Sequence, residues 1–409
     1  MKCRHCHETL NLSFIDLGSA PPSNAYLTPE QLHVPEKWFP LRVLVCTNCW
    51  LVQTEDFANA TELFDENYAY FSSFSQTWLT HAERYVTNAI DRFSLNSESY
   101  VVEVAANDGY LLQYFKSRDI PCLGIEPTKS TANAAREKGL EIVEKFFGVQ
   151  LARELVEQGK QADLMVANNV LAHVPDINVF LSGFAILLKP QGVVTFEFPH
   201  LLKLVKENQF DTIYHEHFSY LSLTAVKHIF AANNLSIFDV EEHPTHGGSL
   251  RVFAQRSDSG SHSSTNRVSD LLHREIQAGL LSANFYSGFQ KRAERVKDDF
   301  LAFLLEAKRQ KKVVAGYGAA AKGNTLLNYS GIRPDLLSFV VDRNPAKQGK
   351  FLPGSRIPIV AEESIKKMRP DYVVVLPWNL KTEIVNQLDY VRAWGGQFVT
   401  AVPKLEVTS

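Results

Sequence analysis

Short apolar runs alternate along the chain with longer stretches in which apolar residues recur at helical spacing. The segment SQTWLTHAERYVTNAIDRF, from about residue 75 to about residue 95, has the spacing that predicts a helix. The apolar runs YVVEV, CLGIE, ADLMVAN and GVVTFEF follow it, each bounded by polar or small residues. Strands that alternate with helices in this way are typical of a parallel sheet covered by helices, so we expect an α/β unit here.

A polar, serine-rich stretch, RSDSGSHSSTNR, interrupts this alternation and introduces a long amphipathic run. Beyond it the strand-like runs return, first in KKVVAGYGAAAKGNTLLN and last in DYVVVLPWN and GGQFVTAVP. The pattern predicts an N-terminal unit over 1–70, a first α/β unit over 71–256, a helical linker over 257–311 and a second α/β unit over 312–409.

The size and charge of the chain limit what it can bind. With 409 residues and 45% hydrophobic side chains, it is long enough for about two or three domains, each with a core. A formal net charge of -3, without a long block of like charge, argues against a nucleic-acid partner held by bulk electrostatics. The N-terminus MKCRHCHETL lacks the apolar core of a signal peptide, and no apolar run reaches the ~18 residues of a membrane span. We expect a cytoplasmic protein without a membrane partner, as a monomer or a small homo-oligomer.

Four of the five cysteines fall into two C-x-x-C pairs, Cys3 with Cys6 and Cys46 with Cys49. Two such turns supply the four thiolates of a tetrahedral zinc site that leaves no position open for chemistry. The segments LSFIDLG, APPSNAYL and FPLRVLV between the pairs are expected to form a small β-rich insert. Disulfides are the alternative, and a cytoplasmic location disfavours them. The cysteine pattern therefore predicts a structural Zn²⁺.

The turn after the first predicted strand, AANDG, carries polar groups and a single glycine. Ligands of parallel α/β sheets bind at the carboxyl ends of the strands, where an acidic residue can accept both ribose hydroxyls of an adenosine. A dinucleotide needs several glycines near its pyrophosphate, so this turn favours S-adenosylmethionine, which has no phosphate. A helix cap for Asp108 and a strand-end role for Asn168 are the alternatives. The residues predicted to bind the cofactor are Glu103, Asn107, Asp108, Gly109, Glu126 and Asn168.

Four side chains capable of acid–base chemistry stand in succession in the stretch YHEH, from Tyr214 to His217. They follow the last strand predicted above, at the sheet edge toward which the cofactor's methyl group should point. An imidazole that titrates near neutrality is a suitable general base, and phenol or imidazole donors can hold a developing oxyanion. His173 lies in the loop after the preceding strand, whereas His246, before two glycines, is interpreted as an ordinary turn histidine.

The order of these motifs resembles a known family. EVAANDGYLL, GIEPT, NNVLAHVPD, FDTIYHEHFSYLS and HGGSLRVF resemble the sugar C-methyltransferases of deoxysugar pathways, which act on nucleotide-linked 4-keto-hexoses. The cysteine pairs look like that family's zinc-binding domain, and VVAGYGAAAKGNTLLN with VVDRNPAKQGKFLPGSRIPI looks like its C-terminal domain. The resemblance covers nearly the whole chain. It implies a small zinc-binding domain, a Rossmann-like S-adenosylmethionine methyltransferase domain and a second Rossmann-like α/β domain.

The resemblance implies methylation of the carbon next to the ketone of a nucleotide-linked 4-keto-deoxyhexose, with C-3′ expected first and C-5′ as the alternative. Transfer to carbon needs a carbanion, which beside a ketone is an enolate, so a base must remove the α proton. In the family's pattern the residue that matches His217 is the base. His215 stays open as the alternative, because the local backbone decides which imidazole points inward. Residues matching Tyr214, Glu216 and His173 line the sugar site.

The resemblance also assigns residues to the rest of the substrate. Tyr68 or Tyr70 is expected to close over the sugar. The C-terminal domain is expected to embrace the nucleotide, because GYGAAAKG places backbone N–H groups and a lysine at a helix start, where an anion can bind. A NAD-dependent nucleotide-sugar oxidoreductase, with Asp342 on the ribose, would use the same loop and is the alternative. The C-terminal residues predicted to bind the substrate are Gly316, Gly318, Lys322 and Asn324.

Overall fold

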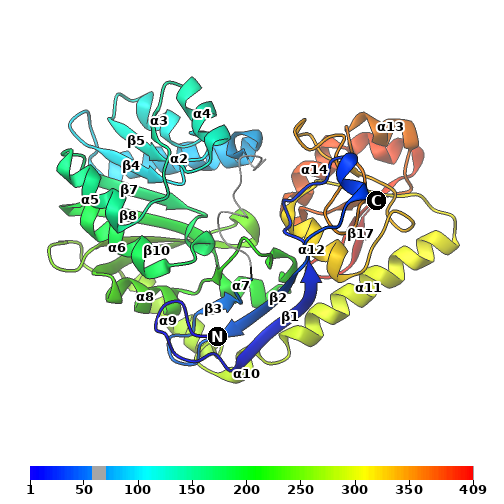
Figure 1. Ribbon diagram of the computed structural model, residues 1–409, viewed down its shortest axis with the longest axis horizontal. Helices are drawn as coiled ribbons and strands as arrows, with labels where there is room; N and C mark the ends of the chain where they lie inside the picture. The colour runs from blue at the N-terminus through cyan, green and yellow to red at the C-terminus, as the bar shows by residue number, and fades with distance from the viewer. Residues whose placement is uncertain (58–70, 409) are drawn as a thin grey trace.

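The computed structural model describes residues 1–57 and 71–408. Tyr68 and Tyr70, predicted to close over the sugar, lie outside the described residues. Three sheets organise the described part of the chain. Figure 1 shows them as a lobe built around the largest sheet, a C-terminal lobe, and a small sheet below that lies between the two.

The N-terminal segment folds as an antiparallel sheet that includes a strand from much later in the chain. Its order is β1-β2-β3-β9, and the strands are β1 (Leu12–Ala20), β2 (Phe39–Val45), β3 (Val52–Thr54) and β9 (Ser219–Tyr220). A short 3-10 helix, η1 (Glu30–His33), lies between β1 and β2. The β-rich insert is therefore present, and its fourth strand comes directly after the YHEH stretch.

The first α/β unit contains a seven-stranded sheet of order β10-β11-β8-β7-β4-β5-β6. Strands β8, β7, β4, β5 and β6 are parallel, and β11 and β10 add an antiparallel edge. The strands are β4 (Val101–Val104), β5 (Cys122–Ile125), β6 (Glu141–Val143), β7 (Ala162–Asn168), β8 (Leu188–Pro199), β10 (Leu235–His243) and β11 (Ser249–Arg256).

Helices cover this sheet, and the predicted first helix is α2 (Gln76–Phe93). Ser75 caps it, because its side chain accepts a hydrogen bond from the N–H of Trp78. The other helices are α3 (Leu112–Lys116), α4 (Lys129–Glu137), α5 (Val149–Glu157), α6 (Ile177–Leu187), α7 (Leu201–Lys206) and α8 (Leu223–Ala232). Helix α6 ends at Leu187, and β8 begins at the next residue, Leu188.

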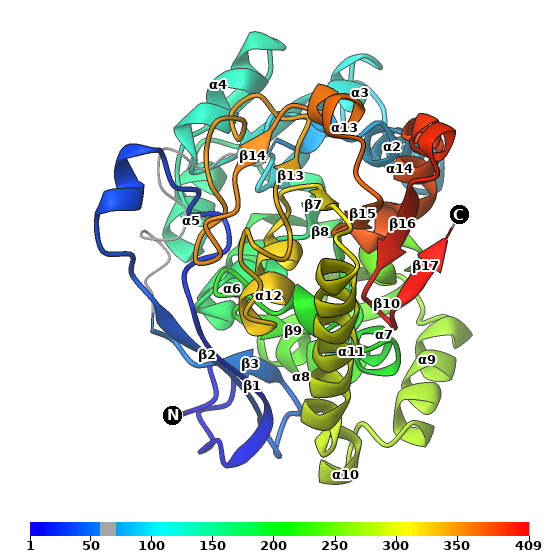
Figure 2. The same cartoon turned by 90° about the vertical axis from the view of Figure 1, so that its right-hand side faces the viewer.

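The predicted linker contains three helices: α9 (Asn266–Gln277), α10 (Ala283–Tyr286) and α11 (Phe289–Arg309). Figure 2 shows α11 running along the outside of the molecule from α10 toward the C-terminal sheet. The fully buried Glu275 of α9 accepts hydrogen bonds from the N–H groups of Leu223 and Thr224 and from His200. It thereby caps α8 and fixes the linker to the first sheet.

The second α/β unit has a six-stranded sheet of order β14-β13-β12-β15-β16-β17. Only the β16–β17 pair is antiparallel. The strands are β12 (Val314–Tyr317), β13 (Val340–Val341), β14 (Ile359–Val360), β15 (Tyr372–Val375), β16 (Gln397–Thr400) and β17 (Glu406–Thr408). The helices are α12 (Ala321–Tyr329), α13 (Glu363–Met368) and α14 (Lys381–Gln387).

One apolar cluster of buried side chains joins the small sheet to the C-terminal sheet and includes α7 of the first α/β unit. Phe14 of β1 stacks on Phe289 of α11 with ring centroids 4.5 Å apart. Phe210, near the YHEH stretch, meets Tyr329 of α12 edge-on at 5.5 Å. Such packing disfavours independent motion of the units, because separating them would expose apolar surface. Within residues 1–57 and 71–408, no helix has both the length and the apolar character needed to cross a bilayer.

Candidate active site at the junction of three sheets

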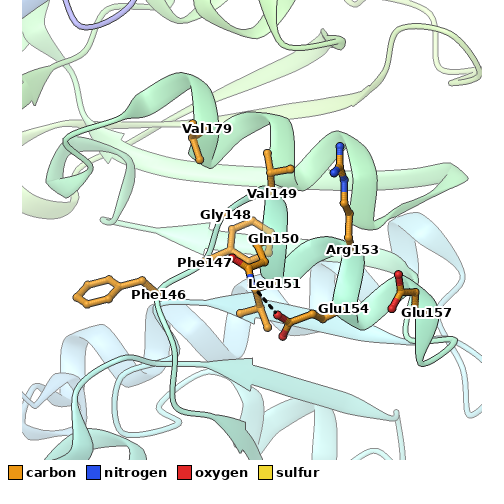
Figure 3. A pocket seen from close by; sticks show the side chains of 10 residues that line it. All are labelled: Phe146, Phe147, Gly148, Val149, Gln150, Leu151, Arg153, Glu154, Glu157 and Val179. Atoms are coloured by element: carbon orange, nitrogen blue, oxygen red, sulfur yellow. Dashed lines mark hydrogen bonds between the residues drawn. The ribbon is translucent and has the colours of Figure 1, made fainter.

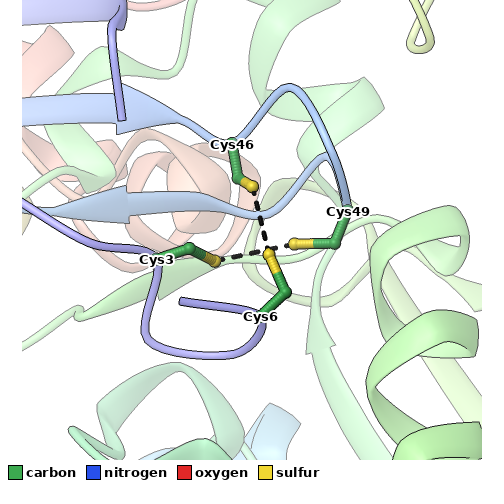
Figure 4. Close-up of side chains that lie close together, drawn as sticks. All are labelled: Cys3, Cys6, Cys46 and Cys49. Atoms are coloured by element: carbon green, nitrogen blue, oxygen red, sulfur yellow. Dashed lines mark hydrogen bonds between the residues drawn. The ribbon is translucent and has the colours of Figure 1, made fainter. Parts of the chain in front are cut away.

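The four predicted zinc ligands lie together at the N-terminal end of the small sheet. All four sulfur atoms are within 4.8 Å of one another, and the Cys3–Cys49 and Cys6–Cys46 sulfur atoms are 3.6 and 3.5 Å apart. Figure 4 shows the side chains converging from two turns. Sulfur atoms about 2.3 Å from a tetrahedral Zn²⁺ lie about 3.8 Å from one another, so the residues fit this ion. His5 is turned away, because its Nδ1 contacts Asn178 Oδ1 at 2.8 Å.

The zinc knuckle contacts the loop that carries His173. Arg4, between the first two cysteines, is 9% exposed and donates from Nη1 to the carbonyl oxygen of Pro175 at 2.9 Å. Its Nη2 donates to the carbonyl oxygen of Thr54 in β3 at 3.1 Å. Gln53 donates from Nε2 to Cys3 Sγ at 3.3 Å. The metal site therefore supports the geometry of the neighbouring loop that carries His173, as well as its own domain.

The predicted cofactor turn follows β4 and has an unusual backbone. Ala105, Asn107 and Gly109 have positive φ angles of 60°, 49° and 74°. At Gly109 a Cβ atom would come within 2.3 Å of Leu140 Cδ1, so the position requires both the conformational freedom and the small size of glycine. The turn therefore keeps its backbone close to the carboxyl end of the sheet. A ligand that packs against this end of the sheet needs such a close turn.

Buried acceptors without partners surround this turn. Within the described residues, Glu103 has no hydrogen-bond partner at either carboxylate oxygen, and neither does Asp108 Oδ1 or Asn168 Oδ1. Burial raises the pKa of Glu103 well above its usual range. A buried polar atom without a partner is costly, so these acceptors are suited to a ligand that donates hydrogen bonds. The ammonium group and ribose hydroxyls of S-adenosylmethionine are such donors.

Glu126 stands at the end of β5, as predicted for a ribose acceptor. Its two oxygens accept hydrogen bonds from the backbone N–H groups of Asn107 and Thr128, both at 2.9 Å. The carboxylate is thus held rigidly, and each oxygen keeps a second lone pair for a hydroxyl. Ser72 closes the other side of the turn, because its N–H donates to Asn107 Oδ1 at 2.9 Å. This fixed arrangement suits an adenosine ribose.

The YHEH stretch forms a tight loop whose two histidines point to different places. His217 Nδ1 lies 2.8 Å from the carbonyl oxygen of Thr212. A carbonyl only accepts, so Nδ1 carries the proton and Nε2 carries the lone pair. His215 is 7% exposed, and its Nε2 contacts the carbonyl oxygens of Phe39 and Pro40, both at 3.2 Å. His215 therefore fixes the loop to β2, whereas His217 remains partly exposed.

Aromatic groups gather around His217. Its ring centroid lies 3.9 Å from that of Tyr214 and 4.6 Å from that of His173. Burial lowers the pKa of His217 well below its usual range, and the neighbouring His173 adds to this effect. Burial also lowers the pKa of His173 to about 4. Both imidazoles are therefore neutral near pH 7, which is the form that a general base needs. The expectation that the base titrates near neutrality is not met, because burial makes the imidazole of His217 a weaker base than a free one.

Glu216 is buried next to His173 and His217. It is 1% exposed, and its backbone oxygen accepts a hydrogen bond from His173 Nδ1 at 2.8 Å. Its Oε1 accepts from the side-chain amide of Asn24 at 3.1 Å, whereas Oε2 has no hydrogen-bond partner in the described part of the chain. Burial raises the pKa of Glu216, and the hydrogen bonds from Asn24 oppose that shift.

Two residues of this region were missed or under-rated from the sequence. His246, interpreted as a turn histidine, has a positive φ of 54° and lies 5.0 Å from Trp78 between ring centroids. Its Nε2 is 3.1 Å from Asn169 Nδ2. Asp211 is fully buried, and its Oδ2 accepts from Trp378 Nε1 of the C-terminal unit at 2.7 Å. The two glycines after His246 gave the signal for the strained turn, but no local pattern marks Asp211.

The second glycine turn differs from the predicted anion site. Gly316, predicted to bind the substrate, lies inside β12 rather than in the turn, and α12 begins at Ala321. The N–H of Gly318 donates to Val341 O, and that of Ala319 donates to Asp342 Oδ2, both at 2.8 Å. These donors are therefore already used within the fold.

The side chains of Lys322 and Asn324 do not point at the glycine turn and lie at the junction with the other units of the chain. Lys322 Nζ lies 4.4 Å from the ring centroid of Trp378 and donates to Asn379 Oδ1 at 2.7 Å. Its charge is one of the causes that lower the pKa of His217 and of His246, which places the ammonium group near the YHEH loop. Asn324 is fully buried and donates to the carbonyl oxygen of Ser23 at 2.6 Å.

A surface hollow lies elsewhere, between α5 and α6. Phe146 and Phe147 line it together with Arg153, Glu154 and Val179. Figure 3 shows Phe146 pointing away from the helices and the charged side chains spread along the rim. None of the predicted site residues lines this hollow. It is therefore separate from the cofactor turn and from the YHEH loop.

Three models of known protein domains match three consecutive segments of the chain. Residues 3–64 match the model of a putative zinc binding domain. Residues 78–240 match a methyltransferase domain, and residues 244–403 match a C-methyltransferase C-terminal domain. The order of these matches follows the three sheets of the fold, but their bounds differ, because β9 of the small sheet lies in the second match and β11 of the seven-stranded sheet lies in the third.

Individual proteins are similar to this chain over different lengths, and NovU matches it over its full length. The C-methyltransferase NovU of Streptomyces niveus is 34% identical over 408 residues, which cover 100% of this chain and 97% of that protein. A ubiquinone biosynthesis O-methyltransferase of Bartonella bacilliformis is 22% identical over 129 residues, which cover 30% of this chain and 51% of that protein. Among solved structures, the magnesium protoporphyrin IX methyltransferase of Synechocystis is 15% identical, with a TM-score of 0.35 over 44% of this chain and 83% of that chain.

The fold, the cysteine site and the cofactor turn define an S-adenosylmethionine-dependent methyltransferase with a structural zinc domain. With a relative that matches along its full length, the chain belongs to the family of three-domain C-methyltransferases. The predicted fold class is confirmed, and so are the two predicted cofactors, S-adenosylmethionine and Zn²⁺.

Proposed function

We propose that this enzyme methylates the carbon next to the ketone of a nucleotide-linked 4-keto-deoxyhexose, at C-3′ or alternatively at C-5′, through an enolate. The observation that carries this proposal is the state of His217. Its Nδ1–H is fixed by the carbonyl of Thr212, its Nε2 holds a lone pair, and its lowered pKa keeps it unprotonated at neutral pH. An acidic C–H beside a ketone is the substrate that such a base can deprotonate.

The side chains around His217 have complementary roles in this proposal. Nε2 of His217 takes the α proton, and the electron pair of the C–H bond moves toward the ketone oxygen to give the enolate. The phenol of Tyr214 donates a hydrogen bond to that oxygen as its negative charge develops. His173, with its proton on Nδ1, accepts from a sugar hydroxyl through Nε2. S-adenosylmethionine, when bound, supplies the electrophilic methyl group.

The C-terminal unit is proposed to bind the nucleotide part of the substrate. Lys322, partly exposed at the junction, offers a cation to the diphosphate, and Asn324 keeps an unpaired Oδ1 among the described residues. Thr325 joins α12 to the catalytic loop, because its Oγ1 donates to the carbonyl oxygen of Ile213 at 2.9 Å. Binding energy from the nucleotide would thereby position the sugar at His217.

A NAD-dependent oxidoreductase gains no support from the fold. Asp342, which would hold the ribose, accepts instead from the N–H groups of Ala319 and Asn344, both at 2.8 Å. The turn donors that a pyrophosphate needs are occupied by these bonds and by Val341. Reduced cysteine thiols grouped as metal ligands also suit the cytoplasmic location that we include in the proposal.

The decisive experiment replaces the base and keeps the cofactor site. His217→Asn should lower methyl transfer to nucleotide-linked 4-keto-sugars by about 10²- to 10⁴-fold, the usual contribution of a general base. S-adenosylmethionine affinity, measured by calorimetry, should stay unchanged. His228→Asn, an exposed imidazole on α8, is the matched control and should behave as wild type.

Isotope exchange gives a second measurement that needs no methyl transfer. Wild type with a 4-keto-sugar in heavy water and without S-adenosylmethionine should exchange the α proton, and His217→Asn should do so far more slowly. Equal exchange in the two proteins would move the role of base to Tyr214 or His215. A wild type that methylates none of the 4-keto-sugars would refute the substrate class itself.

A further inference from the structure

A short loop of the zinc-binding domain reaches into the junction of the three sheets. It runs from Ser23 to Tyr26, between β1 and β2. The carbonyl oxygen of Ser23 accepts from Asn324 Nδ2 at 2.6 Å, and the Tyr26 hydroxyl donates to the carbonyl oxygen of Ala319 at 2.5 Å. Two hydrogen bonds thus fix this loop against the start of α12.

Asn24 lies between these two anchors and faces the YHEH loop. Its backbone N–H and its side-chain Nδ2 both donate to Glu216 Oε1, at 3.3 and 3.1 Å. The Tyr26 hydroxyl lies 3.4 Å from Asn24 Oδ1, but its one proton is donated to the much nearer carbonyl oxygen of Ala319. The side-chain amide is therefore oriented with its donor toward the carboxylate, and residues 192 apart in the sequence are joined directly.

The two carboxylate oxygens of Glu216 are unequal as a result. Oε1 receives both hydrogen bonds from Asn24, whereas Oε2 is buried and lacks a partner among the residues that the structure describes. A buried carboxylate oxygen without a donor is costly, unless a ligand supplies one. Glu216 is thus anchored through one oxygen and available through the other.

We infer that Asn24 of the zinc-binding domain is a positioning residue for catalysis, which holds Glu216 through Oε1 so that Oε2 can accept a hydrogen bond from a sugar hydroxyl. The inference rests on the proposed function and on the family resemblance, which implies that Glu216 lines the sugar site. It also gives the zinc-binding domain a direct part in the active site, through a loop about 20 residues from the nearest cysteine along the chain.

Burial and hydrogen bonding act on Glu216 in opposite directions. Burial favours the neutral acid, and donors to the carboxylate favour the charged form. Removal of the Asn24 amide should therefore raise the pKa of Glu216. If the charged form is the active one, the acid limb of the pH profile of kcat should move to higher pH.

Among the ionisable groups near Glu216, the phenols do not titrate in the acid range, whereas the imidazoles of His173 and His217 do. The Glu216→Gln background separates their contribution from that of Glu216. Burial raises the pKa of the phenols of Tyr26 and Tyr220, so both stay neutral in the acid range. Burial lowers the pKa of His173 to about 4. The titratable and charged groups that face Glu216 or its immediate neighbours include Tyr26, Tyr220, His173, His217, Arg4, Lys347 and Asp342, and Lys322 and His246 act on His217.

The test compares two substitutions at Asn24 with a matched control in the same domain. Asn24→Ala removes the amide, and Asn24→Asp places a second carboxyl group against Glu216. Asn24→Ala should lower kcat/KM for the sugar nucleotide about tenfold, the value of one hydrogen bond to a charged group. Asn24→Asp should move the acid limb furthest, because like charges in contact raise a pKa. Gln31→Ala, whose exposed side chain contacts the N–H of Thr28, should behave as wild type.

Zinc content, melting temperature and S-adenosylmethionine affinity are measured on each variant and should equal those of wild type. In a Glu216→Gln background, Asn24→Ala should no longer move the acid limb, since the titrating group is absent. An active wild type with an Asn24→Ala variant of equal kcat/KM and equal pH profile would overturn this inference alone. A loss of zinc or of cofactor binding in both variants would assign Asn24 to folding and overturn it too. A wild type inactive on every keto-sugar would refute the proposed function itself.

Discussion

Each α/β unit contains a strand, a turn of small residues and a helix in succession, but only the first of the two turns has the features of a ligand site. In the first, β4 leads through AANDG into α3, and in the second, β12 leads through GAAA into α12. The first turn is surrounded by buried acceptors, Glu103, Asp108 and Asn168, that have unpaired oxygens within the described residues. In the second turn, Asp342 and Val341 already accept from the backbone donors.

The difference shows that topology selects the place for a ligand, whereas unpaired polar atoms select the ligand. A strand, a small-residue turn and a helix start recur in both units, so this pattern alone cannot separate a cofactor site from a filled turn. Unsatisfied acceptors at the first turn call for a ligand that donates hydrogen bonds. At the second turn, a carboxylate of the protein occupies the position that a phosphate would take in a dinucleotide site.

The largest effect should come from a change outside both turns. Cys46→Ser removes a zinc ligand, and structural zinc sites supply about 10–16 kcal/mol in zinc-finger peptides. Most of the variant should therefore be unfolded or insoluble, with both turns lost together, while wild type carries about one equivalent of zinc. Zinc analysis and circular dichroism measure this, with Cys122→Ser as the control. A soluble, zinc-free and fully active Cys46→Ser protein would contradict the structural role.

A smaller effect should be confined to the first turn. Glu126→Ala removes the rigid ribose acceptor and should weaken S-adenosylmethionine about 10- to 100-fold, because hydrogen bonds to a charged group contribute about 1.5–3 kcal/mol. Calorimetry with the cofactor and with a nucleoside diphosphate measures this, and the second ligand should be unaffected. Glu141→Ala, an exposed carboxylate of β6, is the matched control. Unchanged cofactor affinity in Glu126→Ala would place the ribose elsewhere.

The smallest effect should be confined to the second unit. Lys322→Ala should weaken nucleotide-sugar binding roughly fivefold, as expected for a partly exposed ion pair of about 1 kcal/mol. S-adenosylmethionine affinity should hardly change. Lys366→Ala is the matched control, since Lys366 also lies over an aromatic ring of this unit, at 4.6 Å from Tyr390. If wild type binds NAD tightly and Lys322→Ala abolishes that binding, the second turn is the cofactor site. The alternative function, a NAD-dependent oxidoreductase, would then be favoured.

The fold was predictable wherever a local pattern decides it. Apolar periodicity located α2 and the parallel strands of the first sheet, and the cysteine spacing located the zinc ligands. The boundaries of turns were less predictable. Gly316 lies in β12, where Val340 of the neighbouring strand packs so closely that a Cβ atom added at Gly316 would come within 2.9 Å of it. The pairing of β3 with β9 had no local signal, since it joins segments far apart in the sequence.

The candidate site was predictable by residue type but not by orientation. The sequence offered His215 and His217 as equals in chemistry, and their roles differ because β2 supplies carbonyl acceptors to His215. Asp211 and Asn24 carry no motif, and they matter through contacts made across domain boundaries. The domain boundaries and the roles of individual site residues stay predictions until the variants above are measured.

The pairing of β3 with β9 also has a consequence for how the protein is made. Thr54, at the end of β3, binds the carbonyl oxygen of His217, and the two are 163 residues apart in the chain. On the ribosome, the N-terminal sheet must wait for its last strand until most of the methyltransferase domain has been synthesised. Such distant contacts slow folding, because a long loop must close first. The YHEH loop therefore acquires its final shape only after β9 has been synthesised, when the second half of the chain is about to emerge from the ribosome.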